Sequence, residues 1–512
     1  MSENAYSGRR VRKSLLHFLS GKVASALVGF SILLLLVRAL SREEYGAYVA
    51  LVALFEILQL GSNFGVFAAT FRYVPELRAR NDVSRLRRLT RDLLLFRTLT
   101  LLACAAFLAV AAPHIARWID MPWMSNALRL YALVLLFEGL ARFTDQLFDS
   151  LLLQGYSQAC ILLRNGLRLL GLLLLGTHIV SGVAFNIQLW VAVEAVASGV
   201  GALLSIYLLN LSIRRPQEDS AQRANDIDYG RVRAYALPAY TSQVVGLAQG
   251  PDVVKLLVAR LADAVQTGAF GFAAALNGMM QRYLPVFLLI GMVRPLFVSA
   301  KEQGRSNAEL VGLASLVFKL NVFVLAPLGA LVVVMGDPIA NVLSGGKFPE
   351  AGLYLAALLV LLLFQTLRTV IGLLALVVEE SRAGLTGTIT GLAGFAGGVL
   401  AFPVFGPIAL CGGLIASELL WCLAMQRALA RHGVAFRTDV LGMGKIAISA
   451  GFVILLLLSV RSWLHVPQGI AILISLVAAG VSFLLIAYLI KPFLGSERGL
   501  INRVLPRSLF VW

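Results

Sequence analysis

The stretch SLLHFLSGKVASALVGFSILLLLV, residues 14–37, decides the fold class. A helix needs about 20 apolar residues to cross the hydrocarbon core of a bilayer, and this stretch is long enough. A basic segment precedes it, as in a signal peptide, but the run is too long for the apolar region of such a peptide and shows no A-x-A-like cleavage site. We interpret it as a retained first membrane span.

Similar apolar stretches recur along all 512 residues. Hydrophobic residues make up 59% of the chain, charged residues make up 14%, and the mean hydropathy is +0.83. Because no water-soluble core needs so large an apolar fraction, the composition predicts an all-α polytopic membrane protein. The four cysteines show no metal-type spacing, so we interpret them as buried thiols and expect no metal site: Cys104, Cys160, Cys411 and Cys422.

Hydropathy and turn residues predict about fourteen membrane spans. They are placed at residues 14–37, 47–71, 93–112, 126–150, 160–179, 187–210, 235–259, 268–291, 311–335, 351–378, 384–402, 406–428, 445–463 and 468–490.

The formal net charge of +17 would suggest nucleic acid in a soluble protein, but here the basic residues gather in short connections between spans. If the N-terminus is cytoplasmic, most of these connections fall on the cytoplasmic side, as the positive-inside rule requires. An even number of spans then places both termini in the cytoplasm. We predict a multi-pass protein of a bacterial inner membrane and no nucleic-acid partner.

The longest polar insert, residues 214–233, separates six spans from the remaining eight, and no loop is long enough to form a catalytic domain. The predicted organisation is a basic N-terminus (1–13), a six-span N-lobe (14–210), a linker (211–234), a six-span C-lobe (235–428), two further spans (429–490) and a cytoplasmic tail (491–512).

The chain matches itself after a shift of 222 positions, the separation of Arg38 and Arg260. The same shift places Gly46-Ala47-Tyr48 over Gly268-Ala269-Phe270 and Arg97 over Lys319. It carries the first span onto the seventh, which has the same orientation, so the two lobes are predicted to be parallel repeats. Such repeats are typical of transporters that alternate access to a substrate.

The connection after the first span reads Val37-Arg38-Ala39-Leu40-Ser41-Arg42-Glu43-Glu44-Tyr45-Gly46-Ala47-Tyr48. It resembles the R-x-L-S-x-E-E-Y-G-x-Y signature of polysaccharide transporters in the multidrug/oligosaccharidyl-lipid/polysaccharide exporter superfamily. Residues 61–65 and the segment Phe71-Arg72-Tyr73-Val74-Pro75-Glu76 are also similar to that family. The motifs cover roughly the first 80 residues, while the later spans match in length, count and spacing.

The resemblance implies a V-shaped pair of six-helix lobes with a central cavity, followed by two extra helices. It also implies a flippase, without cofactor, that moves an undecaprenyl-diphosphate-linked oligosaccharide from the cytoplasmic to the periplasmic leaflet. Such a protein serves O-antigen, exopolysaccharide or capsule biosynthesis. Its expected partners are membrane lipids and, as possible further partners, a polysaccharide polymerase and assembly proteins.

Charged side chains at bilayer depth are costly, so those present should face a wet cavity or a partner. A diphosphate carries at least two negative charges, and a cationic cavity would offset its loss of water. We therefore predict a substrate-binding set, although basic residues near span ends can also reach the headgroups: Lys22, Arg142, Arg168, Lys255, Arg282, Lys319 and Arg368.

Acidic residues within spans suggest ion coupling, because protonatable carboxylates in transporters often carry protons. We select Asp252, Glu56 and Glu194. Asp252 follows Gly250-Pro251, which can break the seventh helix, and it lies three residues before Lys255 on one helix face. Asp145 lies three residues after Arg142, which predicts a local ion pair.

Two other functions compete with the flippase. A drug or cation antiporter of the same superfamily would carry an acid in the first helix and an apolar cavity, whereas this first helix carries Lys22. A polysaccharide polymerase or glycosyltransferase would need paired carboxylates, histidines or a sizeable outer loop, and the five histidines are scattered toward span ends. We therefore expect no catalytic residues and no enzyme.

Overall fold

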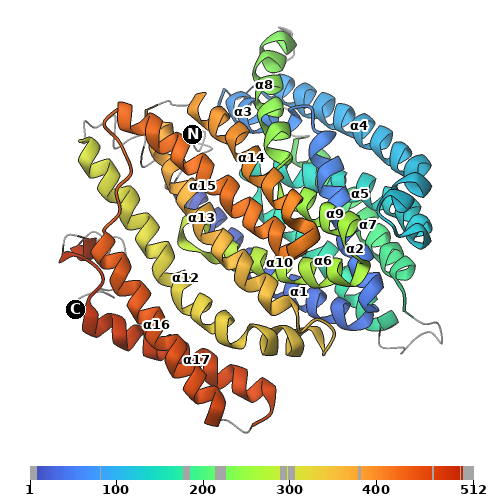
Figure 1. Cartoon of the computed structure of the whole chain (residues 1–512). Helices are drawn as coiled ribbons and strands as arrows, with labels where there is room; N and C mark the ends of the chain where they lie inside the picture. Colours follow the sequence, from blue (N-terminus) through green and yellow to red (C-terminus); the bar gives the residue numbers. More distant parts are fainter. Residues whose placement is uncertain are drawn as a thin grey trace. The chain divides into compact units, whose positions relative to one another are not determined.

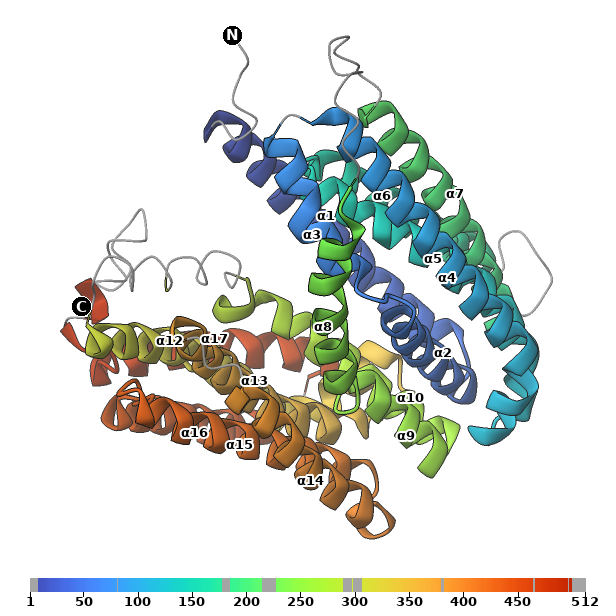
Figure 2. The same cartoon turned by 90° about the horizontal axis from the view of Figure 1, so that it is seen from above.

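A computed structural model describes residues 8–80, 82–176, 185–213, 227–288, 297, 306–378, 382–463, 466–495 and 497–499. The chain divides into two compact units, Met1–Gly268 and Ala269–Trp512, and long helices dominate both (Figure 1 and Figure 2). The linker predicted at 211–234 and the tail predicted at 491–512 lie largely outside the described residues. The six-span division of the lobes stays a prediction.

The helices follow the predicted spans closely. The first unit contains α1 (Gly8–Ala39), α2 (Arg42–Gly61), α3 (Val66–Ala79), α4 (Val83–Trp118), α5 (Ser125–Ser150), α6 (Gln154–Gly176), α7 (Ile187–Ile213), α8 (Tyr229–Leu247) and α9 (Pro251–Leu261). Helix α10 (Ala264–Tyr283) crosses the boundary between the units. The second unit continues with α12 (Asn307–Ser344), α13 (Ala351–Val377), α14 (Arg382–Phe405), α15 (Pro407–Arg431), α16 (Val440–Trp463) and α17 (Gln468–Ile490).

Eleven helices in the described part of the chain are long and apolar enough to cross a membrane. They account for every predicted span except the first, seventh and eighth. Large apolar side chains point outward, among them Val110 at 80% exposure and Leu400 at 81%. Because soluble proteins rarely expose wide apolar patches, these faces fit contact with lipid. The predicted all-α polytopic fold is confirmed.

The signature between the first two spans has a local structural reason. Ser41 is the N-cap of α2: its hydroxyl accepts from the Glu44 backbone N–H at 3.1 Å, and the Glu44 carboxylate accepts from the Ser41 N–H at 3.1 Å. Glu44 also accepts from the backbone N–H of Ile187 at 3.1 Å, which ties it to the start of α7. At Gly46, a Cβ would lie 1.7 Å from the carbonyl oxygen of Ala264, so only glycine permits this approach.

The predicted second span is broken into α2 and α3 at residues 62–65. Gly65 has a φ of +82°, and a Cβ there would lie 2.4 Å from the carbonyl oxygen of Ala236 in α8. The side chain of Arg97 is fully buried beside the break, where it donates to the backbone oxygen of Gln59 and to the Ser62 hydroxyl, each at 3.0 Å. A cation at a helix C-terminus compensates carbonyls that the broken helix leaves unpaired.

The helix bounds agree with the internal repeat. A shift of 222 positions places α2, Arg42–Gly61, directly over α10, Ala264–Tyr283. It also carries α1 onto the span of α8 and α9 together, and α4 onto α12 with an offset of a few residues. Arg97 and Lys319, which the shift aligns, are both 0% exposed, so each unit buries a cation at the same position of its repeat.

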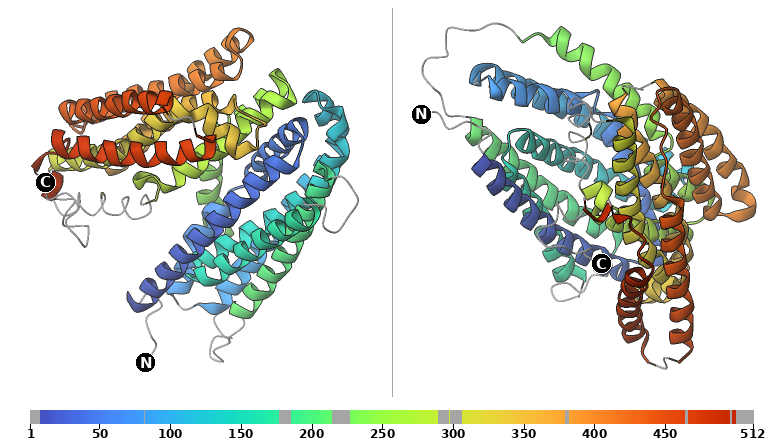
Figure 3. Two further views of the ribbon diagram at one scale, coloured as in Figure 1. Left: turned by 90° about the horizontal axis from the view of Figure 1, so that it is seen from below. Right: turned by 90° about the vertical axis from the view of Figure 1, so that its left-hand side faces the viewer.

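The two helices that follow the second lobe in sequence pack within the second unit. Phe323 of α12, Val453 of α16 and Phe483 of α17 belong to one buried apolar cluster. The rings of Phe323 and Phe483 lie 5.1 Å apart. Figure 3 shows α16 and α17, in red, running beside α12 in both views.

Helices α14 and α15 approach each other through small residues. Gly394 and Gly398 form a G-x-x-x-G pair on α14, and a Cβ on Gly398 would lie 2.7 Å from both the Ala409 carbonyl oxygen and the Gly413 Cα. Small residues at this spacing let helix backbones come close in a membrane, where van der Waals contact drives their association.

Replacing Gly398 by valine is expected to destabilise the second unit by about 2–3 kcal/mol, because the added methyl groups meet backbone atoms that cannot move independently. Thermal unfolding of the purified protein in detergent measures the effect. Gly397→Val is the matched control, since a Cβ at Gly397 meets no atom within 4 Å. Equal unfolding temperatures for the two variants would contradict the packing argument.

Candidate functional site

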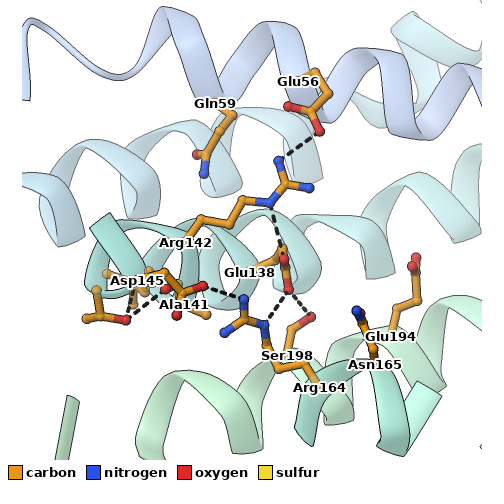
Figure 4. A network of polar contacts seen from close by, with 12 residues as sticks. Glu56, Gln59, Glu138, Ala141, Arg142, Asp145, Arg164, Asn165, Glu194 and Ser198 are labelled. Atoms are coloured by element: carbon orange, nitrogen blue, oxygen red, sulfur yellow. Dashed lines mark hydrogen bonds and ion pairs between the residues drawn. The ribbon is translucent and has the colours of Figure 1, made fainter. Parts of the chain in front are cut away.

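Seven charged side chains from four helices meet inside the first unit, and we call them the charge cluster. Three are arginines and four are acids: Arg142, Arg164, Arg168, Glu56, Glu138, Asp145 and Glu194. They come from α2, α5, α6 and α7 (Figure 4). Residues 138 and 142 of α5 are four positions apart, as are residues 164 and 168 of α6. Each pair therefore lies on one helix face.

Glu138 is the centre of the charge cluster. Its Oε2 lies 2.7 Å from Arg168 Nη2 and 3.5 Å from Arg164 Nε, while its Oε1 lies 3.2 Å from Arg142 Nε. The hydroxyl of Ser198 on α7 also donates to Oε2 at 3.0 Å. The Glu138 side chain is 7% exposed, so its charge is balanced by these partners rather than by water.

Arg142 is the most accessible cation of the charge cluster. Its side chain is 42% exposed, its Nη1 lies 2.8 Å from Glu56 Oε1, and its guanidinium carbon lies 4.7 Å from the centre of the Phe55 ring. The contacts to Glu56 and Glu138 use Nη1 and Nε. Its Nη2 therefore has no hydrogen-bond acceptor among the described residues and can donate to an approaching anion.

Arg164 and Asp145 form the buried end of the charge cluster. Arg164 Nη2 lies 2.6 Å from Asp145 Oδ2, and both side chains are buried. The predicted pair of Arg142 with Asp145 is therefore wrong. Although residues three apart are neighbours on a helix, Arg142 is held by Glu138 one turn back and by Glu56 across the gap to α2, while Asp145 faces α6.

Glu194 on α7 is held less tightly than the other acids. The Tyr48 hydroxyl donates to its Oε1 at 3.1 Å, and Arg168 Nε is 3.8 Å from the same oxygen. Its Oε2 is buried and has no hydrogen-bond partner among the described residues. With four carboxylates and three guanidinium groups, the charge cluster carries one excess negative charge when all are ionised. It can balance that charge by holding one proton or one cation.

The predicted break in the seventh span is confirmed. Helix α8 ends at Leu247, Gly250 is the N-cap of α9, and Pro251 is the first residue of α9. Asp252 therefore lies in the first helical turn, where the helix dipole favours a negative charge. Lys255 Nζ lies 2.8 Å from Asp252 Oδ1, and both side chains are about one fifth exposed. The structure thus brings this predicted pair together.

The other predicted cations lie in different places. In the second unit, Arg368 Nη1 on α13 lies 3.2 Å from Glu418 Oε2 on α15, and its guanidinium carbon lies 4.7 Å from the centre of the Trp421 ring. Arg282 is exposed in the last turn of α10 and makes no ion pair with a described residue. Lys22 lies in α1, but its side chain is outside the described part of the structure.

Lys319, also predicted to bind substrate, has a different environment. Its side chain is 0% exposed, and its Nζ lies 2.6 Å from Asp439 Oδ2 and 2.7 Å from Glu497 Oε2. Asp439 precedes α16, and Glu497 follows α17. The buried lysine therefore ties α12 to the segments flanking the last two helices, and this geometry favours an anchor.

Replacing Lys319 by methionine is expected to destabilise the protein by about 3 kcal/mol, because two carboxylates lose their partner. Desolvation raises the pKa of Asp439, but the hydrogen bond from Lys319 outweighs it and holds this pKa below its usual range. A carboxylate whose pKa is lower in the folded than in the unfolded protein stabilises the fold at pH values above its unfolded-state pKa. This stability is lost as the pH falls through the folded-state pKa.

The measurement is thermal unfolding of wild type and Lys319→Met between about pH 7 and pH 3. Wild type is expected to lose this stability below about pH 4, and the difference between the two proteins should shrink there. Lys319→Arg, which keeps the charge but adds volume to a fully buried site, is the control: it should lose some stability but keep the pH dependence of wild type. A difference that is independent of pH would contradict the pairing.

The sequence did not single out the centre of the charge cluster. Glu138, Asp145 and Arg164 were absent from the predicted binding and coupling sets, and so was Ser198. The sequence did contain a signal: charged residues are spaced four apart on α5 (138 and 142) and again on α6 (164 and 168). Two such charged faces on neighbouring spans can face each other. Ser198 had no comparable signal, since serines are common at membrane helix contacts.

Comparison with known proteins supports the resemblance. Residues 35–154 match the family described as "Polysaccharide biosynthesis protein". This range includes Glu56, Glu138, Arg142 and Asp145 of the charge cluster. No curated protein sequence matches the chain.

The fold is similar to that of solved transporters. "Lipid II flippase MurJ, inward closed conformation" has a TM-score of 0.68 at 12% identity, with 94% of this chain and 99% of that chain covered. An inward-facing multidrug resistance transporter of the MATE family scores 0.59 at 11% identity, covering 80% of this chain and 95% of that one. A MATE transporter from Vibrio cholerae has a TM-score of 0.54 at 15% identity, with 83% of this chain and 98% of that chain covered. The chain therefore has the same fold as these solved transporters and is a multi-pass membrane protein.

Proposed function

We propose that this chain is a flippase that moves an undecaprenyl-diphosphate-linked oligosaccharide from the cytoplasmic to the periplasmic leaflet by alternating access. The observation that carries this proposal is the match of residues 35–154 to a polysaccharide biosynthesis family. The solved structures quoted above include a lipid II flippase and are transporters rather than enzymes, which supports a non-enzymatic role. The positive-inside pattern supports an inner-membrane location with both termini cytoplasmic.

Within each unit taken by itself, an arginine that already has partners supports an anionic cargo. Arg142 is held by two carboxylates and Arg368 by one, and each lies against an aromatic ring, so their guanidinium groups are oriented in advance. Each keeps N–H groups that can bind phosphate oxygens. Lys255 and Arg282 would add charge, and Arg168 would hold the charge cluster together through Glu138.

We further propose that the charge cluster couples flipping to protons. Glu194 is the residue for which this role has most support, because its Oε2 has no hydrogen-bond partner in the described structure and its charge is balanced least. Glu56, which is partly exposed, could connect the charge cluster to water, and Asp252 is a second candidate at the α8–α9 break.

Replacing Glu194 by glutamine is expected to abolish the response of flipping to an imposed proton gradient, because glutamine cannot exchange a proton. Flipping without a gradient should continue, since Gln can still accept from Tyr48. The measurement compares flipping rates in proteoliposomes with and without a pH gradient. A variant that still responds like wild type would exclude Glu194 as the coupling residue.

A multidrug or cation antiporter is the second candidate, because the charge cluster has one excess carboxylate and MATE transporters share the fold. One experiment separates the two functions. Proteoliposomes containing the chain are tested for flipping of a fluorescent undecaprenyl-diphosphate oligosaccharide and for proton-driven efflux of organic cations. Flipping without efflux supports the proposal, whereas efflux without flipping of any matched sugar-lipid would replace it with the antiporter.

A further inference from the structure

The N-terminal part of α4 carries a basic stripe that the proposed function does not use. Ser84, Arg87, Arg88 and Arg91 are spaced at i, i+3, i+4 and i+7, so they share one helix face. All four are exposed. The apolar part of α4 is predicted to begin at residue 93, so the stripe starts at headgroup level with Arg91 and reaches roughly 15 Å beyond the apolar part at Ser84.

This stripe borders a cavity of about 440 Å³ within the first unit. Leu209 and Asn210, near the end of α7, also line the cavity (α4 and α7 are labelled in Figure 2). Asp92 is the one carboxylate among its described lining residues, and it accepts a hydrogen bond from the Tyr229 hydroxyl. Three arginines against one acid leave the lining with two excess positive charges.

Thr90 gives independent evidence for a ligand. Its side chain lines the same cavity, yet the residue is 3% exposed and its hydroxyl has no hydrogen-bond partner among the described residues. A threonine in a helix usually bonds to a carbonyl one turn back, as Thr98 does with Leu94 at 2.7 Å. A buried hydroxyl without a partner is costly, so it indicates that something in the cavity accepts its hydrogen bond.

We propose that this cavity binds the phosphate group of a membrane lipid. The arginine forks of Arg87 and Arg91 would bind phosphate oxygens, the Thr90 hydroxyl would donate from the floor, and Ser84 would donate from the rim. The position at headgroup level, beside the apolar surface of α4, places a lipid phosphate within reach while its chains remain in the bilayer. Exposed arginines that served topology alone would need neither the cavity nor the unpartnered hydroxyl.

Two lipids present this chemistry, the anionic phospholipids of the bilayer and an undecaprenyl diphosphate. The site does not depend on the proposed function, and the test separates the two sources. Purified full-length protein in detergent is titrated with phosphatidylglycerol, with undecaprenyl diphosphate and with diacylglycerol, which lacks the phosphate. Binding is followed by native mass spectrometry. Tighter binding of phosphatidylglycerol identifies a bilayer lipid, tighter binding of undecaprenyl diphosphate identifies a substrate-type lipid, and either result supports the site.

The variant Arg87→Ala/Arg91→Ala is expected to weaken binding of the preferred lipid by roughly 25-fold, as each basic residue near a lipid surface contributes about fivefold. Arg72→Ala/Arg80→Ala, which removes two exposed arginines of α3 and its C-terminus, is the matched control and should bind like wild type. Thr90→Val should weaken binding several-fold while leaving thermal stability unchanged or raised, because it removes a hydroxyl with no partner in the described protein.

Three results would overturn the proposal. They are equal binding of diacylglycerol and of the phosphate-bearing lipids, equal binding by the Arg87→Ala/Arg91→Ala variant and its control, and a Thr90→Val variant that binds like wild type. The last result would mean that an ordered water satisfies the hydroxyl.

Discussion

Replacing Glu138 by alanine is expected to destabilise the first unit by about 3–5 kcal/mol, the largest loss that any single substitution in the charge cluster should cause. Glu138 faces Arg142, Arg164 and Arg168 at once, and two of these arginines are themselves buried. Removing the central acid leaves their charges without their common partner in a site that water reaches poorly. Helices α5, α6 and α7 would then lose the ion pairs and the Ser198 hydrogen bond that Glu138 makes between them.

Thermal unfolding in detergent, followed together with monodispersity, measures this loss. Glu56→Ala is the matched control: its side chain is one third exposed and contacts Arg142 alone among the cluster's arginines, so its loss should cost less than about 1 kcal/mol. Glu138→Gln should fall between the two, because the amide oxygen can still accept from the arginines. A Glu138→Ala protein as stable as Glu56→Ala would show that the charge cluster does not hold the unit together.

Replacing Arg142 by alanine is expected to reduce flipping of the diphosphate-linked oligosaccharide by about tenfold to a hundredfold, with folding intact. Arg142 is the accessible arginine of the charge cluster, and its Nη2 has no acceptor among the described residues. Glu138 keeps Arg164 and Arg168 as partners in this variant, so the unit should stay folded. The measured quantity is the initial flipping rate in proteoliposomes at matched protein content.

Arg142→Lys tests the chemistry of the contact. Lysine keeps the charge but presents a point charge without the planar fork, so flipping should recover in part. Arg72→Ala, an exposed arginine of α3, serves as the control and should flip like wild type. If Arg142→Ala flipped the lipid as fast as wild type, Arg142 would not bind the phosphate. Its role would then be structural, through its ion pairs.

The sequence predicted the helices well because hydropathy reports directly on burial in lipid. The break at Gly250-Pro251 was also predictable, since proline starts α9 at its first position. The break between α2 and α3 was missed. It contains no proline, and its cause lies in tertiary contacts: Arg97 compensates the end of α2, and Gly65 makes room for α8.

The charged residues were found more easily than their partners. Four members of the charge cluster were predicted as site residues, because charges within a span stand out against apolar sequence: Arg142, Arg168, Glu56 and Glu194. Which carboxylate each arginine meets depends on how α2, α5, α6 and α7 pack, and spacing within one helix predicted Asp145 for Arg142 instead of Glu56 and Glu138. The partners of Lys319 lie 120 and 178 residues away, beyond any local pattern.

The most direct test of the account is the flipping rate of one oligosaccharide carried on undecaprenyl diphosphate compared with the same sugar on undecaprenyl monophosphate. Both are measured in proteoliposomes of the wild-type chain and of Arg142→Ala. Wild type is expected to flip the diphosphate lipid at least about tenfold faster than the monophosphate lipid, and Arg142→Ala should remove most of this preference. Equal rates for the two lipids in wild type, or no flipping of either, would contradict a flippase that recognises its cargo by the diphosphate.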